Sequence, residues 1–185
     1  MSREETRNVE PIVTPPVTKE AYRNGMAKLG AAVSIVTTDG PAGKAGFTAS
    51  AICSVTDTPP TLLVCLNRAA SVYDTVSGNG VVAVNTLAPQ HQSLADLFGG
   101  KTPVDERFAA ANWFRGQSGA PLLEDAVVSF DCRVAHLTDV GSHSVLFCEV
   151  VGIAHGTLAS GLFYFNRMYH AMGDMPAGEM RQNAQ

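Results

Sequence analysis

The sequence lacks the short motifs on which several large enzyme classes depend. It contains no G-x-G-x-x-G, no P-loop, no G-x-S-x-G and no H-E-x-x-H. These motifs form, in that order, the dinucleotide site of Rossmann dehydrogenases, the phosphate-binding loop of nucleoside triphosphatases, the nucleophile elbow of α/β-hydrolases and the zinc site of zincins. Their absence therefore argues against all four classes.

Charged residues are scarce and dispersed. They make up 16% of the 185 residues, and 13 Lys and Arg against 17 Asp and Glu give a net charge of −4. Without a basic cluster there is no electrostatic footprint for nucleic acid or for an anionic membrane. The start of the chain, "MSREETRNVE", also lacks the apolar core of a signal peptide, and no apolar run approaches the ~18 residues of a membrane span. We expect a cytoplasmic protein with no nucleic-acid or membrane partner.

Cysteine and histidine are present without a pattern. The four cysteines form no C-x-x-C pair and stand among apolar neighbours, which is typical of small core residues. The five histidines show no spacing that would bring ligands together on one helix or hairpin. Because zinc sites need three or four converging ligands, no metal site is expected.

Composition and length indicate one domain. A chain of 185 residues with 45% hydrophobic residues can bury one sizeable core. Residues 1–17 are polar and contain "EPIVTPPV", and residues 174–185 are similarly polar. We expect a loose N-terminal arm over 1–17, a folded domain over 18–173 and a loose C-terminal tail over 174–185.

Hydrophobic periodicity predicts a mainly β fold with a few helices. One helix is expected over 18–30, with Thr18 as its cap, Gly30 as its stop and an apolar face of Tyr22, Met26 and Leu29. Short runs rich in β-branched residues, separated by turns such as "DGPAG" and "TDTPP", predict about seven antiparallel strands. The strands are expected at 31–38, 47–55, 61–67, 81–87, 127–140, 142–156 and 161–170, and further helices at 70–78 and 90–99. Without regular βαβ alternation, a closed or partly open β-barrel is favoured.

The stretch "GKAGFTASAICSV" (43–55) combines small and hydroxyl-bearing residues and contains no His, Asp, Glu or Arg. Small side chains let a flat heteroaromatic ring approach the backbone, and hydroxyl and N–H groups can serve its polar edge. Thr48, Ala49, Ser50 and Ser54 offer this combination. The alternative is that Thr48 and Ser50 are only the solvent face of a half-exposed strand. An enzyme without an acid or base of its own can still act if its cofactor carries the reaction.

Several blocks together resemble one known family. The succession "GFTASAICSVTDTPPTLLVCLNRAAS", "VVAVNTLA", "LADLFGG", "ERF", "GAPLLEDAVVSFDCRV", "GSHSVLFCEV" and "LFYFNRMYH" is similar to short-chain flavin reductases, the reductase components of two-component monooxygenases acting on 4-hydroxyphenylacetate, phenols and chlorophenols. The resemblance implies an FMN-binding split barrel and a homodimer. It also implies that NADH or NADPH reduces free FAD or FMN, and that the reduced flavin is released to a partner monooxygenase.

The resemblance also implies which residues bind flavin. Thr48, Ala49, Ser50 and Ser54 would lie along the isoalloxazine ring; Leu66, Asn67 and Ser71 would reach the ribityl chain and phosphate; Asn85, Phe98, Gly99 and Lys101 would occupy further flavin-proximal positions. Two of these have simpler explanations. Ser71 precedes a short helix and could be an ordinary N-cap, and a loop lysine such as Lys101 is usually just solvated.

The residues predicted to contact the nicotinamide nucleotide come from two further sequence blocks. His143 in "GSH" matches a histidine that in the family lies near flavin and nicotinamide, usually after an aspartate that is Ser142 here. Without that carboxylate, a charged imidazole is less favoured, whereas a positioning role is still expected. Arg167, Tyr169 and His170 in "NRMYH" would help to hold the nicotinamide nucleotide. Alternatively, Tyr169 packs against the barrel and the stem of Arg167 covers it.

The expected reaction is hydride transfer from C4 of the reduced nicotinamide to N5 of the flavin. The protein would contribute stacking, short distances and hydrogen bonds to the flavin edge, without an obligatory general base. Two other classes are compatible with the same residues. One is a flavoprotein oxidase that keeps its flavin, as pyridoxamine-phosphate oxidases do; the other is a flavin-binding protein without enzymatic activity.

Overall fold

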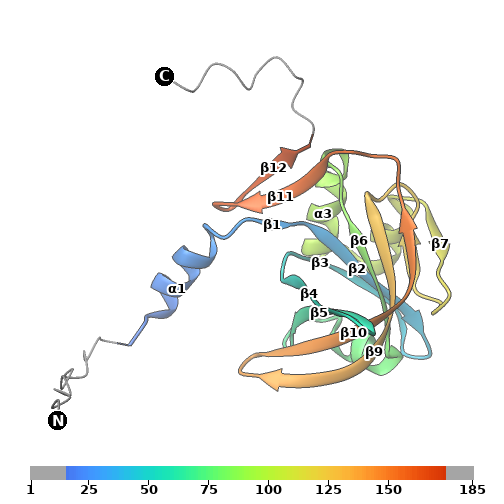
Figure 1. Cartoon of the computed structure of the whole chain (residues 1–185), viewed down its shortest axis with the longest axis horizontal. Helices are drawn as coiled ribbons and strands as arrows, with labels where there is room; N and C mark the ends of the chain where they lie inside the picture. The colour runs from blue at the N-terminus through green and yellow to red at the C-terminus, as the bar shows by residue number, and fades with distance from the viewer. Residues whose placement is uncertain (1–15, 174–185) are drawn as a thin grey trace, which may run out of the picture.

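The structure is a computed structural model that describes residues 16–173 (Figure 1). The predicted tail, and all but the last two residues of the predicted arm, lie outside this range. The helices are α1 (Lys19–Met26), α2 (Tyr73–Asn79), α3 (Gln92–Gly99) and α4 (Val104–Ala109), and the short 3-10 helix η1 (Pro89–His91) precedes α3. Within the described residues, none of these helices has the length and apolar character needed to cross a membrane.

The structure contains more and shorter strands than the sequence predicts. They are β1 (Ala31–Ala32), β2 (Ser34–Gly40), β3 (Gly43–Ala49), β4 (Ile52–Asp57), β5 (Pro60–Asn67), β6 (Val81–Thr86), β7 (Trp113–Arg115), β8 (Pro121–Leu123), β9 (Val128–Val140), β10 (His143–His155), β11 (Gly161–Phe165) and β12 (Met168–Met172). Three predicted strands, 31–38, 47–55 and 161–170, are each divided in two, and β7 and β8 are not among the predicted strands. The last, 161–170, is a hairpin because Asn166 and Arg167 adopt positive φ angles of 49° and 62°, which close a two-residue turn.

The main sheet explains the second division, at 47–55. Its seven strands are antiparallel in the order β3-β2-β6-β9-β10-β5-β4. The first and last strands of this order, β3 and β4, are consecutive in the chain and are joined only by Ser50 and Ala51. The sheet must therefore curl until its two edges meet at this link (Figure 1). Because β3 pairs with β2 while β4 pairs with β5, one continuous strand is impossible there. The result is a barrel split between β3 and β4, as the mainly β split-barrel prediction requires.

The barrel interior is filled by alternate side chains of its strands. On β5, Leu62, Val64 and Leu66 are buried with counterparts from β2, β6, β9 and β10. Leu63 and Cys65, at the intervening positions, point to the outer face of the same strand because side chains alternate along a strand. The outer face of β5 is thus available for another partner.

Helix α3 covers the free edge strand β3. Its Phe98 is 1% exposed and packs edge-on against Phe108 of α4, with the ring centroids 5.2 Å apart. A Cβ atom on Gly46 of β3 would lie 2.6 Å from Cε1 of Phe98. Glycine at this position therefore allows the helix to approach the strand.

Arg107 of α4 fixes the loop that follows α3. It is 6% exposed, and its guanidinium donates to the carbonyl oxygens of Thr102 (2.6 Å), Gly46 (3.1 Å) and Gly100 (3.0 Å). These acceptors belong to β3 and to the segment after α3. A buried cation stabilised by several carbonyl oxygens thus holds this segment against the edge of the split.

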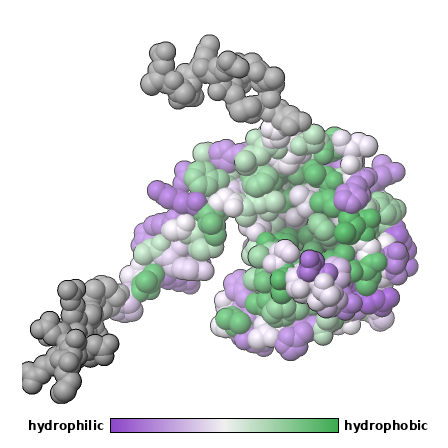
Figure 2. Space-filling model, viewed as in Figure 1, coloured by the Kyte–Doolittle hydropathy of each residue, from purple (hydrophilic) through white to green (hydrophobic). Residues whose placement is uncertain are grey.

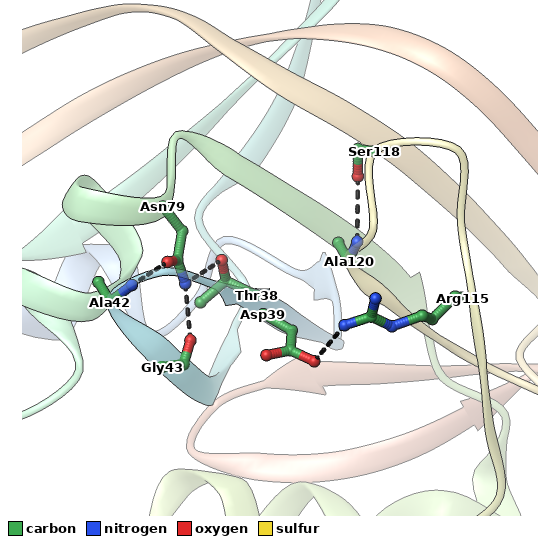
Figure 3. Close-up of polar contacts among 8 residues, drawn as sticks. All are labelled: Thr38, Asp39, Ala42, Gly43, Asn79, Arg115, Ser118 and Ala120. Carbon is green, nitrogen blue, oxygen red and sulfur yellow. Dashed lines mark hydrogen bonds and ion pairs between the residues drawn. The ribbon is translucent and has the colours of Figure 1, made fainter.

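Polar contacts also fasten the β2–β3 hairpin to its neighbours (Figure 3). Asn79, the last residue of α2, accepts from the Ala42 N–H at 2.8 Å and donates to the Gly43 carbonyl at 2.8 Å. Asp39 forms an ion pair with Arg115 of β7 at 2.9 Å. The start of β3, at the opposite end of the strand from Ser50, is thereby held in place.

Helix α1 projects from the barrel (Figure 1). As predicted, the Thr18 side chain accepts from the Ala21 N–H and caps the helix, but the helix ends at Met26 and not at Gly30. No residue of α1 is buried: Tyr22 and Met26 are 62% and 45% exposed. The predicted apolar face therefore exists but does not pack on this chain's barrel.

The expectation that all four cysteines are core residues is only partly correct. Cys132 and Cys148 are buried, Cys65 is half-buried, and Cys53 is exposed. Cys53 lies on β4, an edge strand with a single neighbour. An apolar sequence context therefore does not guarantee burial there.

Candidate functional site

A cavity of about 880 Å³ opens beside the split of the barrel. Its walls come from the α1 segment, β1, the link between β3 and β4, the outer face of β5 and the β11–β12 hairpin. The lining residues are Arg23, Met26, Ala27, Leu29, Gly30, Ala31, Ser50, Ala51, Ile52, Cys53, Leu63, Cys65, Tyr164 and Arg167. In Figure 2 the molecule is visibly hollowed between α1 and the barrel. This cavity, called the groove below, is mostly apolar with few polar groups, as small-molecule sites commonly are.

A smaller pocket of about 160 Å³ adjoins the groove. Thr48, Ala49, Ser50 and Tyr169 line it together with Val33 and Tyr164, and Ser50 and Tyr164 also line the groove. The predicted residues Thr48, Ala49, Ser50 and Tyr169 therefore lie together. Arg167 joins them through the groove.

The link between β3 and β4 supplies free hydrogen-bond donors. Neither the Ser50 N–H nor the Ala51 N–H donates to another backbone group in the described chain, and Ser50 is exposed. The Thr48 hydroxyl, by contrast, donates to the Ala95 carbonyl at 2.6 Å. Small side chains with free N–H donors beside an apolar wall fit a flat ring with acceptors along its edge. The residues present therefore fit a flavin ring at this link.

Strand register places His143 on the groove side of the sheet. His143 of β10 lies opposite Asn67 of β5, and Val145 lies opposite Cys65. Facing residues of an antiparallel pair project from the same face, and Cys65 lines the groove. His143 and Asn67 thus continue the groove surface roughly 7 Å farther along β5, at ~3.4 Å per residue.

Local hydrogen bonds hold the turn that carries His143. The Ser142 hydroxyl lies 2.9 Å from Nδ1 of His143. Next along the strand, the buried Ser144 bonds Asp139 at 2.5 Å and Tyr73 at 2.9 Å. Ser142 therefore gives the imidazole a neutral partner in the position next to it, where the family resemblance leads one to expect a carboxylate.

Three predicted residues are buried in the interior of the protein instead. Leu66 and Phe98 are core side chains, 3% and 1% exposed. Asn85 is 0% exposed; its amide donates to the Ile35 carbonyl at 3.0 Å and accepts from the Leu123 N–H at 2.8 Å. These side chains are fully used by the fold. Any flavin contact by these three side chains stays a prediction.

The other predicted residues lie around the site rather than in the groove. Ser54 lines a separate pocket of about 340 Å³ next to Leu62. Ser71 is exposed and does not cap α2, whose N-cap is Val72 without a side-chain bond. The N-cap alternative for Ser71 is therefore wrong. A Cβ atom on Gly99 would be 3.7 Å from Cβ of Thr48, so Gly99 adjoins the predicted ring-binding segment, whereas Lys101 is exposed.

Tyr169 is partly committed to packing. Its ring meets Tyr164 edge-on at 5.3 Å. Burial, followed by the charge of Asp96 and a hydrogen bond with it, raises the pKa of the Tyr169 hydroxyl. The phenol therefore stays protonated at neutral pH, and its hydrogen bond with Asp96 holds the ring at the pocket edge. His170, by comparison, is exposed and bonds the Phe165 carbonyl at 3.2 Å.

Sequence reasoning missed several groove residues. Tyr164 and Cys65 lie on strands whose outward positions follow the alternation, so the period-two pattern could have suggested them. Arg23 lies on α1, and no pattern in the sequence connects that helix with the groove. Its proximity depends on the Asn166 N–H bonding the Ala27 carbonyl.

Comparisons with known proteins agree with this geometry. The flavin reductase like domain matches residues 26–173. A protein of Variovorax paradoxus named FMN reductase (NADH) RutF is 61% identical over 172 residues, covering 92% of this chain and 96% of the relative. Its namesake from Ancylobacter novellus is 60% identical, covering 89% and 91%.

A solved structure extends the agreement to three dimensions. BorF, the flavin reductase component of a bacterial two-component tryptophan halogenase, is 26% identical with a TM-score of 0.79, covering 85% of this chain and 100% of that one. Its likeness includes the split barrel on which the groove depends. With the family match spanning nearly the whole described chain, this protein belongs to the flavin reductase like domain family.

Proposed function

We propose that this protein is an NADH-dependent FMN reductase that releases its reduced flavin. The observation that carries the proposal is the groove at the split of the barrel, which pairs free N–H donors of small residues with an apolar wall. The specific pairing of NADH with FMN is supported by relatives at 60% identity or above that are named for it. FAD as acceptor and NADPH as donor are the alternatives for the assay.

The protein's own residues would position the two substrates. FMN, when bound, supplies the chemistry by accepting at N5 a hydride from C4 of the nicotinamide. The N–H groups of Ser50 and Ala51 would hydrogen-bond the polar edge of the ring and favour the negative charge of its reduced form. The apolar surface of Leu63 and Cys65 would exclude water from one side of the stacked rings.

The His143 imidazole is proposed to position the nicotinamide or flavin edge as a hydrogen-bond donor. If the Ser142 hydroxyl donates to Nδ1, the proton resides on Nε2, which is then free to donate. We expect His143→Ala to raise the KM for NADH, or to slow hydride transfer, by about tenfold, as for the loss of one contact of ~1.4 kcal/mol. Rapid-mixing kinetics with NADH and FMN would measure this. FMN affinity should change less, and kinetics equal to the parent would make His143 an ordinary surface histidine.

The groove position of Cys53 gives a test that needs no turnover. Burial raises the pKa of the Cys148 thiol to about 12 and also raises that of Cys132, so neither should react at neutral pH. The exposed Cys53 should be the first thiol alkylated by iodoacetamide. We expect saturating FMN to slow this alkylation severalfold, as measured by peptide mass spectrometry. Equal rates with and without FMN would place the flavin elsewhere.

The released flavin is proposed to supply a monooxygenase by diffusion. The sequence resemblance predicts a phenol-type enzyme, whereas BorF serves a tryptophan halogenase. An open groove should bind flavin less tightly than an enclosed pocket. In the test, the protein with NADH and FMN is separated by a dialysis membrane, under low oxygen, from a flavin-dependent phenol hydroxylase and its substrate. Hydroxylated product across the membrane supports release; product only in a shared compartment, at equal reduced flavin, contradicts it.

A homodimer is proposed as the assembly. The support is apolar surface that this chain leaves uncovered: Tyr22 on α1 is 62% exposed, and Met168 and Met172 on β12 are 56% and 54% exposed. A helix of eight residues without buried contacts is marginal alone, and large exposed apolar patches mark interfaces. Sedimentation equilibrium decides between dimer and monomer.

A further inference from the structure

The groove carries charge of only one sign. Among its lining residues Arg23 and Arg167 bear full positive charges, and no lining residue is acidic. Neither arginine forms an ion pair with a residue in the described part of the chain. An apolar cavity with two such cations attracts an anion, because low-dielectric walls focus the field.

The two arginines approach the groove from different elements that meet at one point. Arg23 lies in the last turn of α1, and Arg167 lies in the β11–β12 turn. Nη2 of Arg167 donates to Oδ1 of Asn24, the residue after Arg23, at 2.6 Å. The two side chains therefore lie close to the same contact between α1 and the hairpin. Two guanidinium groups in one wall suit phosphate oxygens, which they bind through paired N–H donors.

We propose that Arg23 and Arg167 bind the diphosphate of the nicotinamide dinucleotide. This inference rests on the proposed function and adds α1 to the donor site. The flavin phosphate is the other phosphate available, but it is predicted near Asn67 and Ser71, and neither of these residues lines the groove that contains the two arginines. A dinucleotide has its two phosphate charges between its two nucleosides, so the arginine wall can hold it while the nicotinamide reaches the ring.

Binding of ADP-ribose to the flavin-free protein tests the proposal without turnover. ADP-ribose carries the diphosphate but no nicotinamide, and calorimetry measures its affinity directly. Arg23→Ala should weaken binding about tenfold, and Arg23→Lys should give an intermediate loss because the charge stays but the paired donors do not. Added salt should reduce the difference between variants. Lys28→Ala, which removes a cation from the same segment but outside the groove lining, is the matched control and should bind normally.

A second titration identifies which phosphate is bound. FMN affinity, followed by fluorescence, should be nearly unchanged by Arg23→Ala. Weaker FMN binding with unchanged ADP-ribose binding would overturn the proposal, and so would no change in either. Because Arg23 is exposed on a helix without buried residues, thermal unfolding should be unaffected and folding is not a confounding cause.

The arginine site and the proposed function can be disproved separately. If the parent protein reduces FMN with NADH but Arg23→Ala binds ADP-ribose as tightly, only the arginine site is wrong. If the parent protein does not reduce FMN with NADH, the proposed function is wrong whatever the ADP-ribose result.

Discussion

Replacing Arg107 by alanine is expected to lower the free energy of unfolding by about 3 to 5 kcal/mol, as for other buried hydrogen-bonded charges. The guanidinium donates to four carbonyl oxygens, which belong to β3, to Phe98 of α3 and to the loop after α3. Without it these acceptors lose their donor, the Gly46 and Phe98 oxygens in a buried setting, and α3 loses its attachment to the edge of the split. Thermal unfolding should shift down by about 10 °C for a chain of this size.

Another arginine provides the control. Arg115 pairs with Asp39 at 2.9 Å, but its side chain is 72% exposed. Exposed pairs typically contribute ~1 kcal/mol or less, so Arg115→Ala should change stability little. Arg107→Lys should not restore full stability, since a single ammonium cannot reach carbonyl oxygens in several directions. Equal losses for Arg107→Ala and Arg115→Ala would contradict the role assigned to Arg107.

Ser50→Leu is expected to weaken FMN binding about a hundredfold, or ~2.7 kcal/mol. Ser50 lines both the groove and the adjoining pocket and is exposed at the link. A leucine side chain there would occupy the space in which a flat ring must approach the Ser50 and Ala51 N–H groups. Quenching of FMN fluorescence measures the affinity.

Two control variants separate the effect of side-chain size at position 50 from the effect of losing the Ser50 hydroxyl. Ser50→Ala keeps the space and the N–H donors, so its FMN affinity should fall by less than about threefold, since only one exposed hydroxyl contact is lost. Ser77→Leu places the same bulk on the exposed surface of α2 and should leave FMN binding unchanged. If Ser50→Leu binds FMN as the parent does, with unchanged thermal stability, the ring does not lie at the link.

The kind of fold can be predicted from the sequence because it depends on local patterns of strands and turns. The small residues around Ser50 are a local pattern too, and the structure places them beside the groove, where binding of a flavin ring stays a prediction. The split itself is not local: β3 and β4 become the two edges of one sheet only through pairings with β2 and β5. For the same reason 47–55 is predicted as a single strand.

Side-chain roles show the same limit. Asn85 and Phe98 match family blocks, yet one is buried and hydrogen-bonded between β2 and β8 and the other fills the space under α3. A motif match records the position of a residue and not the direction of its side chain. Arg23 illustrates the opposite case, because its place in the groove depends on a contact between α1 and a hairpin about 140 residues away, an order of separation that no local pattern spans.

The central claim is that the protein transfers hydride from NADH to free flavin and needs no other substrate. The most direct measurement is anaerobic absorbance of the nicotinamide and flavin bands, with NADH and FMN both in large excess over protein. We expect NADH and oxidised FMN to be lost in equal amounts, over many equivalents per protein, and no NADH to be lost when FMN is omitted. Reduction that stops at one FMN per protein, or NADH oxidation by flavin-free protein, would contradict it.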